Sequence, residues 1–99
     1  MCIQNTIMIK SWKHKGLKLF FETGSTAKIQ QKHKQSLREI LFQLDHASCP
    51  QDMNTPGNDF HGLIGKRKGQ YSVSVSGNWR IVFSFDKENV ILVDYLDYH

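Results

Sequence analysis

Arg80 lies at a position in this sequence where its side chain could bind a phosphate. It is in the middle of the stretch WRIVFSF, between Trp79 and Ile81. A guanidinium on a strand needs a partner or water, and its planar shape fits a phosphate bidentately. Two interpretations stand side by side. Arg80 is either a preset anion site, or an arginine that lies over a half-exposed sheet and pairs with an acid such as Asp94.

A short basic segment, GKRKG, precedes Arg80 and could add to such a site. Its cations Lys66, Arg67 and Lys68 stand between two glycines, and a run of this kind is usually solvated. Because the segment joins two expected strands of one sheet, these cations could rim the face that carries Arg80. His61 comes one expected strand earlier, where a structural or exposed histidine is favoured over a catalytic one.

The final residues Asp97, Tyr98 and His99 follow an apolar run directly. We expect them to continue the last strand beside the face of Arg80, with Tyr95 on the same side as Asp97 and His99. An unperturbed histidine has a pKa of about 6.5, which suits proton transfer at neutral pH, and the terminal carboxylate favours the imidazolium. Tyr98 offers a ring for stacking on a base. Frayed terminal residues are the alternative.

Arginine, lysines, a histidine and a tyrosine together suit one reaction class. A ribonuclease that uses the substrate's own 2′-hydroxyl needs a base for that hydroxyl, an acid for the 5′-oxygen and cations around the phosphate. The five histidines show no ligand spacing with cysteines or acids, so no metal site and no cofactor are expected. The composition permits this reaction without requiring it.

Composition indicates one domain with a core of its own. The chain has 99 residues, of which 39% are hydrophobic, and a formal net charge of +4. On charge alone, ordinary solubility is favoured over a polyanionic partner. The two cysteines form no Cys-x-x-Cys pair, and we find neither a signal peptide nor a membrane-spanning run. A reduced, cytosolic compartment fits best.

Hydrophobic periodicity predicts a strand, two helices and then four more strands. The second helix should begin near Ala27, after a cap at Ser25 or Thr26. The segment 46–59 should be a connector without regular structure. The expected strands are 8–12, 60–65, 70–76, 79–85 and 90–96, and the first helix is 14–22.

These elements predict an α+β fold, in the order β-α-α-β-β-β-β. The last four strands should form an antiparallel meander, with tight turns at residues 77–78 and 86–89. Both helices should cover the face that the aromatic side chains of 71–75 and 79–85 identify. The opposite face carries serines and Arg80. The last strand, apolar on both faces, should be central.

Three stretches of the sequence resemble the HigB toxins of the RelE/ParE superfamily. They are MIKSWKHKGLKLFFETG from Met8, GKRKGQYSVSVSGNWRIVFSF from Gly65, and the final Asp-Tyr-His. The resemblance covers nearly everything from Met8 to His99. It implies a single RelE/HigB-like domain at 8–99, with residues 1–7 as an extension or an upstream start. It also implies a RelE-like fold, with two helices on one side of an antiparallel sheet of four to five strands and RNA in the concave opposite face.

The resemblance implies a bacterial, cytoplasmic toxin of a type II toxin–antitoxin system that arrests growth. Such a toxin is an endoribonuclease that cuts messenger RNA in the A site of the 70S ribosome, without a metal. Its expected partner is a HigA-like antitoxin with a helix-turn-helix domain, through which alone operator DNA would be bound. No membrane partner is expected.

Carried over by position, the resemblance assigns roles to particular residues. Arg80 and Arg67 would bind the phosphate, with Lys66 and Lys68 adding attraction. His99 would transfer a proton, Tyr98 would stack on or orient a base, and Asp97 would orient His99 or contact RNA. His61 is a second proton-transfer candidate.

Two other classes of function stay open at this point. A ParE-like inhibitor of DNA gyrase would share the fold and act by binding alone. A non-catalytic RNA-binding or antitoxin-docking module would bind without cleaving. The final Asp-Tyr-His and Arg80 favour the nuclease, because a toxin that acts by binding has no need of them.

Overall fold

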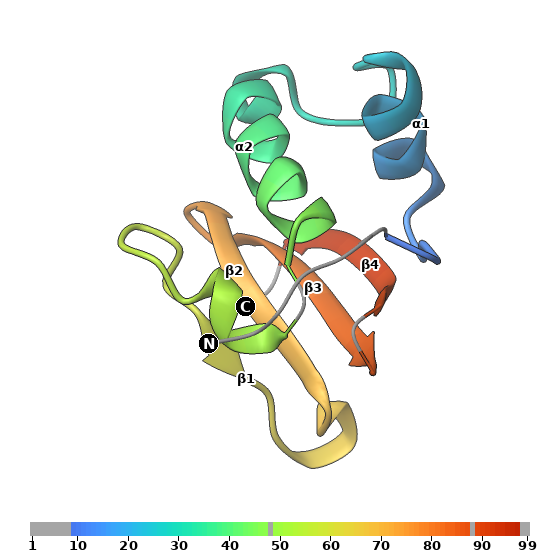
Figure 1. Ribbon diagram of the computed structural model, residues 1–99. Coiled ribbons are helices and arrows are strands. Elements are labelled where there is room, and N and C mark those ends of the chain that lie inside the picture. The colour runs from blue at the N-terminus through green and yellow to red at the C-terminus, as the bar shows by residue number, and fades with distance from the viewer. Residues whose placement is uncertain (1–8, 48, 88, 98–99) are drawn as a thin grey trace.

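The computed structural model describes residues 9–47, 49–87 and 89–97, with the exception of the Arg67 side chain. Two helices, α1 (Lys15–Thr23) and α2 (Lys34–Asp45), precede an antiparallel sheet (Figure 1). The strands are β1 (His61–Gly62), β2 (Gln70–Ser76), β3 (Trp79–Asp86) and β4 (Asn89–Asp97), in that order across the sheet. The predicted meander and α+β class are therefore confirmed. No helix in the described ranges is long and apolar enough to cross a membrane.

Both helices pack on one face of the sheet, as predicted, because each has an apolar stripe at helical spacing. Leu17 and Phe20 come from α1, and the α2 stripe runs along one side of that helix. Alternation along β2 and β3 points Val73, Ile81 and Phe83 toward these stripes, and all three are fully buried. The α2 contributors to the core are Leu37, Ile40, Leu41 and Leu44.

The N-terminal segment differs from the strand predicted at 8–12. Within the described residues, Ile9 and Trp12 form only isolated parallel bridges, to Val90 and Val93 of β4. The backbone N–H of Lys10 donates to the carbonyl of Val90 at 2.7 Å. The segment thus runs along the outer edge of β4. β4 is therefore the edge strand of the four-stranded sheet and not the central strand that the sequence predicts, although two bridges from the N-terminal segment cover part of its outer edge.

A bulge in β4 interrupts regular pairing with β3. The register shifts between Val82 and Ser84, and Leu92 has a left-handed backbone with φ 56°. The N–H of Leu92 donates to Ser11 Oγ at 2.8 Å, so the N-terminal segment stabilises the bulge. Because an extra residue reverses strand alternation, the bulge decides which side chains of the second half of β4 face the helices.

Helix α2 begins at Lys34, later than the start expected near Ala27, and neither Ser25 nor Thr26 caps it. A 3₁₀ turn, η1 (Gln31–His33), precedes it. The preceding segment crosses the start of α1 so closely that a Cβ on Gly16 would collide with the Cβ of Lys28. This tertiary contact explains why the segment around Lys28 is not helical.

The connector was also wrongly expected to lack regular structure. It contains a 3₁₀ turn, η2 (Pro50–Met53), which Pro50 starts and in which Met53 is fully buried. Strand β1 is shorter than the expected 60–65. The chain turns at Gly65, whose φ is +68°, into a third 3₁₀ turn, η3 (Gly65–Arg67).

A buried histidine and a tyrosine link the helical layer to β4. His33 Nδ1 and the Tyr95 hydroxyl are 2.6 Å apart, and the two side chains are 2% and 4% exposed. The Tyr95 oxygen also accepts from the backbone N–H of Gln30, so its own proton is free to be donated to His33. A neutral His33 fits this arrangement, and burial, followed by the positive charge of Lys32, lowers the pKa of His33.

We therefore expect His33 to make the fold less stable in acid. Its pKa is lowered from the ordinary value of 6.5, so its contribution is complete above that pH. Stability is then lost as the pH falls below 6.5 and the unfolded chain takes up a proton that the folded chain excludes. Urea unfolding above and below this pH should show that the free energy of unfolding decreases less in acid for His33→Gln than for wild type. His46→Gln, which changes an exposed histidine, should lose the same stability in acid as wild type. If His33→Gln also lost as much stability in acid as wild type, the effect could not come from His33.

Candidate functional site

The face of the sheet opposite the helices carries the predicted polar residues. Cross-strand partners share a face, and Arg80 is paired with Ser74 on one side and Leu96 on the other. The next row brings Ser72, Val82 and Asp94 together. We call this surface the polar face, made by Ser72, Ser74, Arg80, Val82, Asp94 and Leu96.

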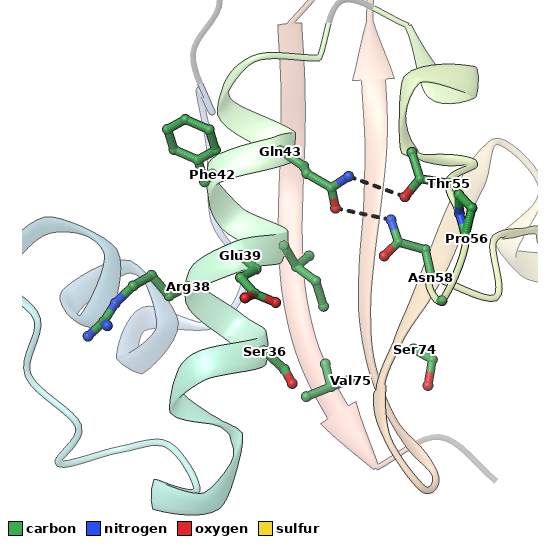
Figure 2. A pocket seen from close by; sticks show the side chains of 12 residues that line it. Ser36, Arg38, Glu39, Phe42, Gln43, Thr55, Pro56, Asn58, Ser74 and Val75 are labelled. Atoms are coloured by element: carbon green, nitrogen blue, oxygen red, sulfur yellow. Dashed lines mark hydrogen bonds between the residues drawn. The ribbon is translucent and has the colours of Figure 1, made fainter.

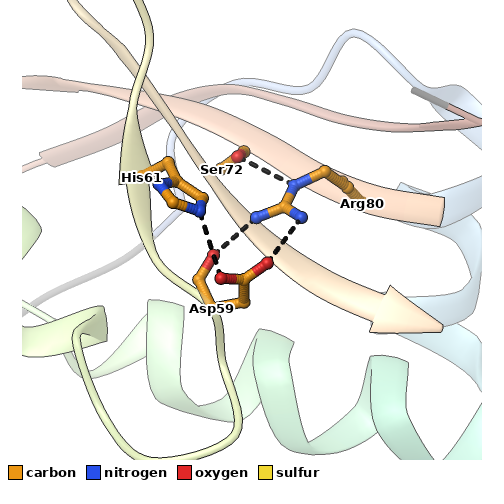
Figure 3. Close-up of polar contacts among 4 residues, drawn as sticks. All are labelled: Asp59, His61, Ser72 and Arg80. Carbon is orange, nitrogen blue, oxygen red and sulfur yellow. Dashed lines mark hydrogen bonds and ion pairs between the residues drawn. The ribbon is translucent and has the colours of Figure 1, made fainter. Parts of the chain in front are cut away.

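Three hydrogen bonds fix the Arg80 guanidinium on the polar face. Arg80 Nε donates to Ser72 Oγ at 2.9 Å, from the neighbouring strand (Figure 3). Its Nη1 donates to Asp59 Oδ2 at 3.2 Å, and its Nη2 to the backbone carbonyl of Asp59 at 2.5 Å. The side chain of Arg80 is only 12% exposed. The guanidinium is therefore held in place at the centre of the face.

Asp59, rather than the expected Asp94, is the acid that pairs with Arg80. The Asp94 carboxylate instead accepts from the backbone N–H of Tyr95 at 2.9 Å. Asp59 is 60% exposed, and the hydrogen bond from Arg80, with the nearby His61 adding to it, lowers the pKa of its carboxyl. The carboxylate is thus ionised at neutral pH, so the anion-binding edge of Arg80 already has an anion beside it.

The loop that carries Asp59 is anchored on both sides by Asn58. The carbonyl of Asn58 accepts from the backbone N–H of Ser74 at 2.7 Å, which ties the loop to β2. The side-chain amide of Asn58 donates to the carbonyl of Met53 at 2.8 Å and to Gln43 of α2 at 3.2 Å. Figure 2 shows the contact between Asn58 and Gln43, which lies in a hollow of about 660 Å³ between α2 and the loop. Asp59 itself has φ 48°, which aspartate tolerates better than most residues.

His61 joins this cluster from β1, as the sequence allowed. Its Nε2 lies 3.1 Å from Asp59 Oδ1, and its side chain is 61% exposed. His61, Ser72 and Arg80 line a pocket of about 360 Å³ together with the turn residues Gly77 and Asn78. The structure thus brings together two candidates that the sequence offered separately, Arg80 and His61. Sequence reasoning missed Asp59, and no periodic signal marks that residue.

The loop cations lie apart from this pocket. Lys66 and Lys68 are exposed in and just after η3, and neither is among the residues that line the pocket. The side chain of Arg67 is outside what the structure describes. The phosphate-binding roles of these three residues therefore stay predictions.

Among the final three residues, the structure describes only Asp97, and not on the expected face. Asp97 is the last residue of β4 and is paired with Trp79, whose ring contacts that of Tyr95 in a tilted arrangement with centroids 4.7 Å apart. Tyr95 is buried on the helix side, so strand alternation places exposed Asp97 on that side too. Tyr98 and His99 lie outside the described residues.

No group of three histidine, cysteine or acidic side chains that could hold a metal ion is found in the described part of the chain. The cluster of Asp59, His61, Ser72 and Arg80 offers hydrogen-bond donors and one guanidinium instead. It can bind an anion, and the exposed imidazole of His61 could exchange a proton with a group bound there.

A solved structure shares this fold. The structure of the YoeB dimer from Staphylococcus aureus contains a chain that superposes with a TM-score of 0.58, with 98% of this chain and 99% of that chain covered at 16% identity. This likeness concerns the fold, two helices over an antiparallel sheet.

Sequence comparison then identifies the family. Residues 10–99 match the family model described as the RelE-like toxin of type II toxin–antitoxin system HigB. "Endoribonuclease HigB" of Proteus vulgaris is 39% identical over 92 residues, covering 93% of this chain and all of that protein. "Toxin HigB-1" of Vibrio cholerae serotype O1 is 33% identical over 97 residues, covering 93% of this chain and 98% of that protein. The chain belongs to the HigB-like toxin family, whose members function with an antitoxin.

Proposed function

We propose that this protein is an endoribonuclease that cleaves messenger RNA during translation and thereby inhibits growth. The observation that carries the proposal is the guanidinium of Arg80, fixed on the polar face beside the exposed imidazole of His61. The printed name of the Proteus relative, an endoribonuclease, supports the same chemistry. Gyrase inhibition leaves this pairing of cation and imidazole without a role, and RNA binding without cleavage would use Arg80 but would need no proton transfer by His61.

The chemistry can proceed with side chains and the RNA alone. A base removes the proton from a 2′-hydroxyl, and the new oxyanion forms a bond to the adjacent phosphorus. The bond from phosphorus to the 5′-oxygen breaks as an acid protonates that oxygen. One product then ends in a 2′,3′-cyclic phosphate and the other begins with a 5′-hydroxyl. Arg80 stabilises the charge that accumulates on the phosphate oxygens in the transition state.

Proton transfer is assigned to two histidines. His99 is the first candidate, on the family resemblance, and His61 is the second because it is exposed beside Arg80. Tyr98 would stack on a base, and Asp97 would orient His99 or contact the RNA. Arg67, Lys66 and Lys68 would attract the phosphate backbone from the loop before β2. None of these roles requires a metal ion or a cofactor.

The experiment that tests the proposal is induction from a tight promoter, followed by growth measurement and mapping of 5′ ends. We expect growth arrest and new 5′-hydroxyl ends within translated reading frames, with untranslated RNA left intact. Damaged DNA beside intact message would favour gyrase inhibition instead. Growth arrest with neither lesion would favour a binding module.

The proposed partners follow from this function. The ribosome with message in its A site would present the substrate, in the bacterial cytoplasm. A HigA-like antitoxin with a helix-turn-helix domain would neutralise the toxin, and operator DNA would be bound only through that antitoxin. Co-expression with the antitoxin should restore growth and suppress the new 5′ ends.

A further inference from the structure

The phosphate-binding edge of Arg80 is already in use in the RNA-free protein. Both terminal nitrogens of the guanidinium donate to one residue, Nη1 to the Asp59 carboxylate and Nη2 to the Asp59 carbonyl. The remaining contact, from Nε to Ser72, lies on the other side of the guanidinium (Figure 3). A phosphate would bind through the same pair of terminal nitrogens, because they form the fork that matches two oxygens.

The two partner residues of Arg80, Asp59 and Ser72, differ in how easily they can be replaced. Asp59 is 60% exposed, and ion pairs with so exposed a partner contribute little net stability. Ser72 is 1% exposed and belongs to β2, so it can hold Arg80 in place when Asp59 moves away. The exposed partner is therefore displaceable, while the buried partner keeps the guanidinium in position.

We propose that Asp59 is an internal substitute for the RNA phosphate, which occupies the fork of Arg80 until the substrate displaces it. This inference rests on the proposed function, because it takes a phosphodiester as the ligand of Arg80. The neighbouring pocket of about 360 Å³ is large enough for one phosphate and part of a nucleotide, and His61 and Ser72 line it.

Asp59 thereby lowers the affinity of the free protein for RNA. The substrate must remove the carboxylate from Arg80 before its own phosphate can bind, and the negative charge of Asp59 remains near the phosphate afterwards. Weak binding to RNA that is free in solution would restrict cleavage to sites where other contacts hold the message in place. The ribosome of the proposed function would provide such contacts.

The test compares binding of a short 2′-O-methyl RNA oligonucleotide, which lacks the attacking hydroxyl, by fluorescence anisotropy at one fixed salt concentration. We expect Asp59→Asn to bind about fivefold tighter than wild type, which is the scale of an exposed ion pair. Asp59→Gly removes the carboxylate while accepting the left-handed backbone, so it should also bind tighter. The gain should disappear when Arg80→Ala is added to either variant.

Asp86→Asn is the matched control, because it removes the same charge at the exposed end of β3. Asp86 is six residues from Arg80 along the strand, roughly 20 Å at 3.3 Å per residue. Equal gains for Asp59→Asn and Asp86→Asn would reduce the effect to net charge and overturn the inference. Weaker binding by both Asp59 variants would show that Asp59 positions Arg80 instead, and would also overturn it. Failure of the proposed function has a different signature, since wild type would then leave translated message intact whatever the oligonucleotide affinities.

Discussion

Replacing Arg80 by alanine is expected to reduce message cleavage about a hundredfold to a thousandfold, the effect typical of removing one group that stabilises the transition state. The Arg80 guanidinium lines the pocket that His61 and Ser72 also line, and Ser72 and Asp59 fix its position. Cleavage would be measured as the rate of loss of full-length message in a translating extract supplied with purified protein.

Two further variants separate the charge of Arg80 from its shape. Arg80→Lys keeps a cation but loses the fork, so we expect an intermediate rate. Ser72→Ala removes the partner of Nε but keeps the guanidinium itself, and should slow cleavage less than Arg80→Ala does. Thermal unfolding of each variant checks that the fold survives. If Arg80→Ala cleaved message at the wild-type rate, Arg80 would be a structural partner of Asp59 and nothing more.

Much of the fold was predictable because local patterns determine it. Strict alternation in β2 and β3 fixed both the hairpin and the face that Tyr71, Val73 and Phe83 present to the helices. The apolar stripe of α1 also predicted this helix correctly although the helix contains Gly16. The glycine is there because a larger residue would collide with Lys28. The start of α2 was not predictable, because it depends on that same passage of one segment over another.

The acid partner of Arg80 was not predictable for a related reason. Asp94 shares the polar face with Arg80, so its position in the sheet would allow the pair. The Asp94 carboxylate is instead turned back to the N–H of Tyr95, and Asp59 takes its place from a loop. That loop reaches Arg80 only because Asn58 anchors it to Ser74, a contact with no periodicity to reveal it.

The face predicted for Tyr95 and Asp97 was wrong because of one extra residue in β4. Val90 and Val93 are both fully buried although they are three positions apart, so the bulge at Leu92 reverses the alternation between them. Without it, Tyr95 and Asp97 would share the polar face with Arg80, as the sequence suggested. With it, Tyr95 faces His33 in the helical layer. Ser11, which lies far away in the sequence, accepts a hydrogen bond from the bulge residue Leu92 and helps to stabilise it.

The second large effect is expected from His99→Ala, which should slow cleavage about a hundredfold or more, within the range for loss of a general acid or base. His99 lies outside the described residues, two positions beyond Asp97, whose cross-strand partner Trp79 is the neighbour of Arg80. Because the proposed role is proton transfer, the pH dependence of single-turnover cleavage on programmed ribosomes should also change. A loss of RNA affinity alone would lower the rate without altering the shape of that profile.

His46→Ala is the matched control, since His46 is an exposed histidine at the end of α2 and does not belong to the polar face. It should cleave at the wild-type rate. His61→Ala tests the second candidate beside Arg80, and comparison with the double variant shows whether the two histidines act in one step. If they are base and acid of the same reaction, the double variant should be little worse than the slower single one. A normal rate and an unchanged pH profile in His99→Ala would transfer the proton-transfer role to His61.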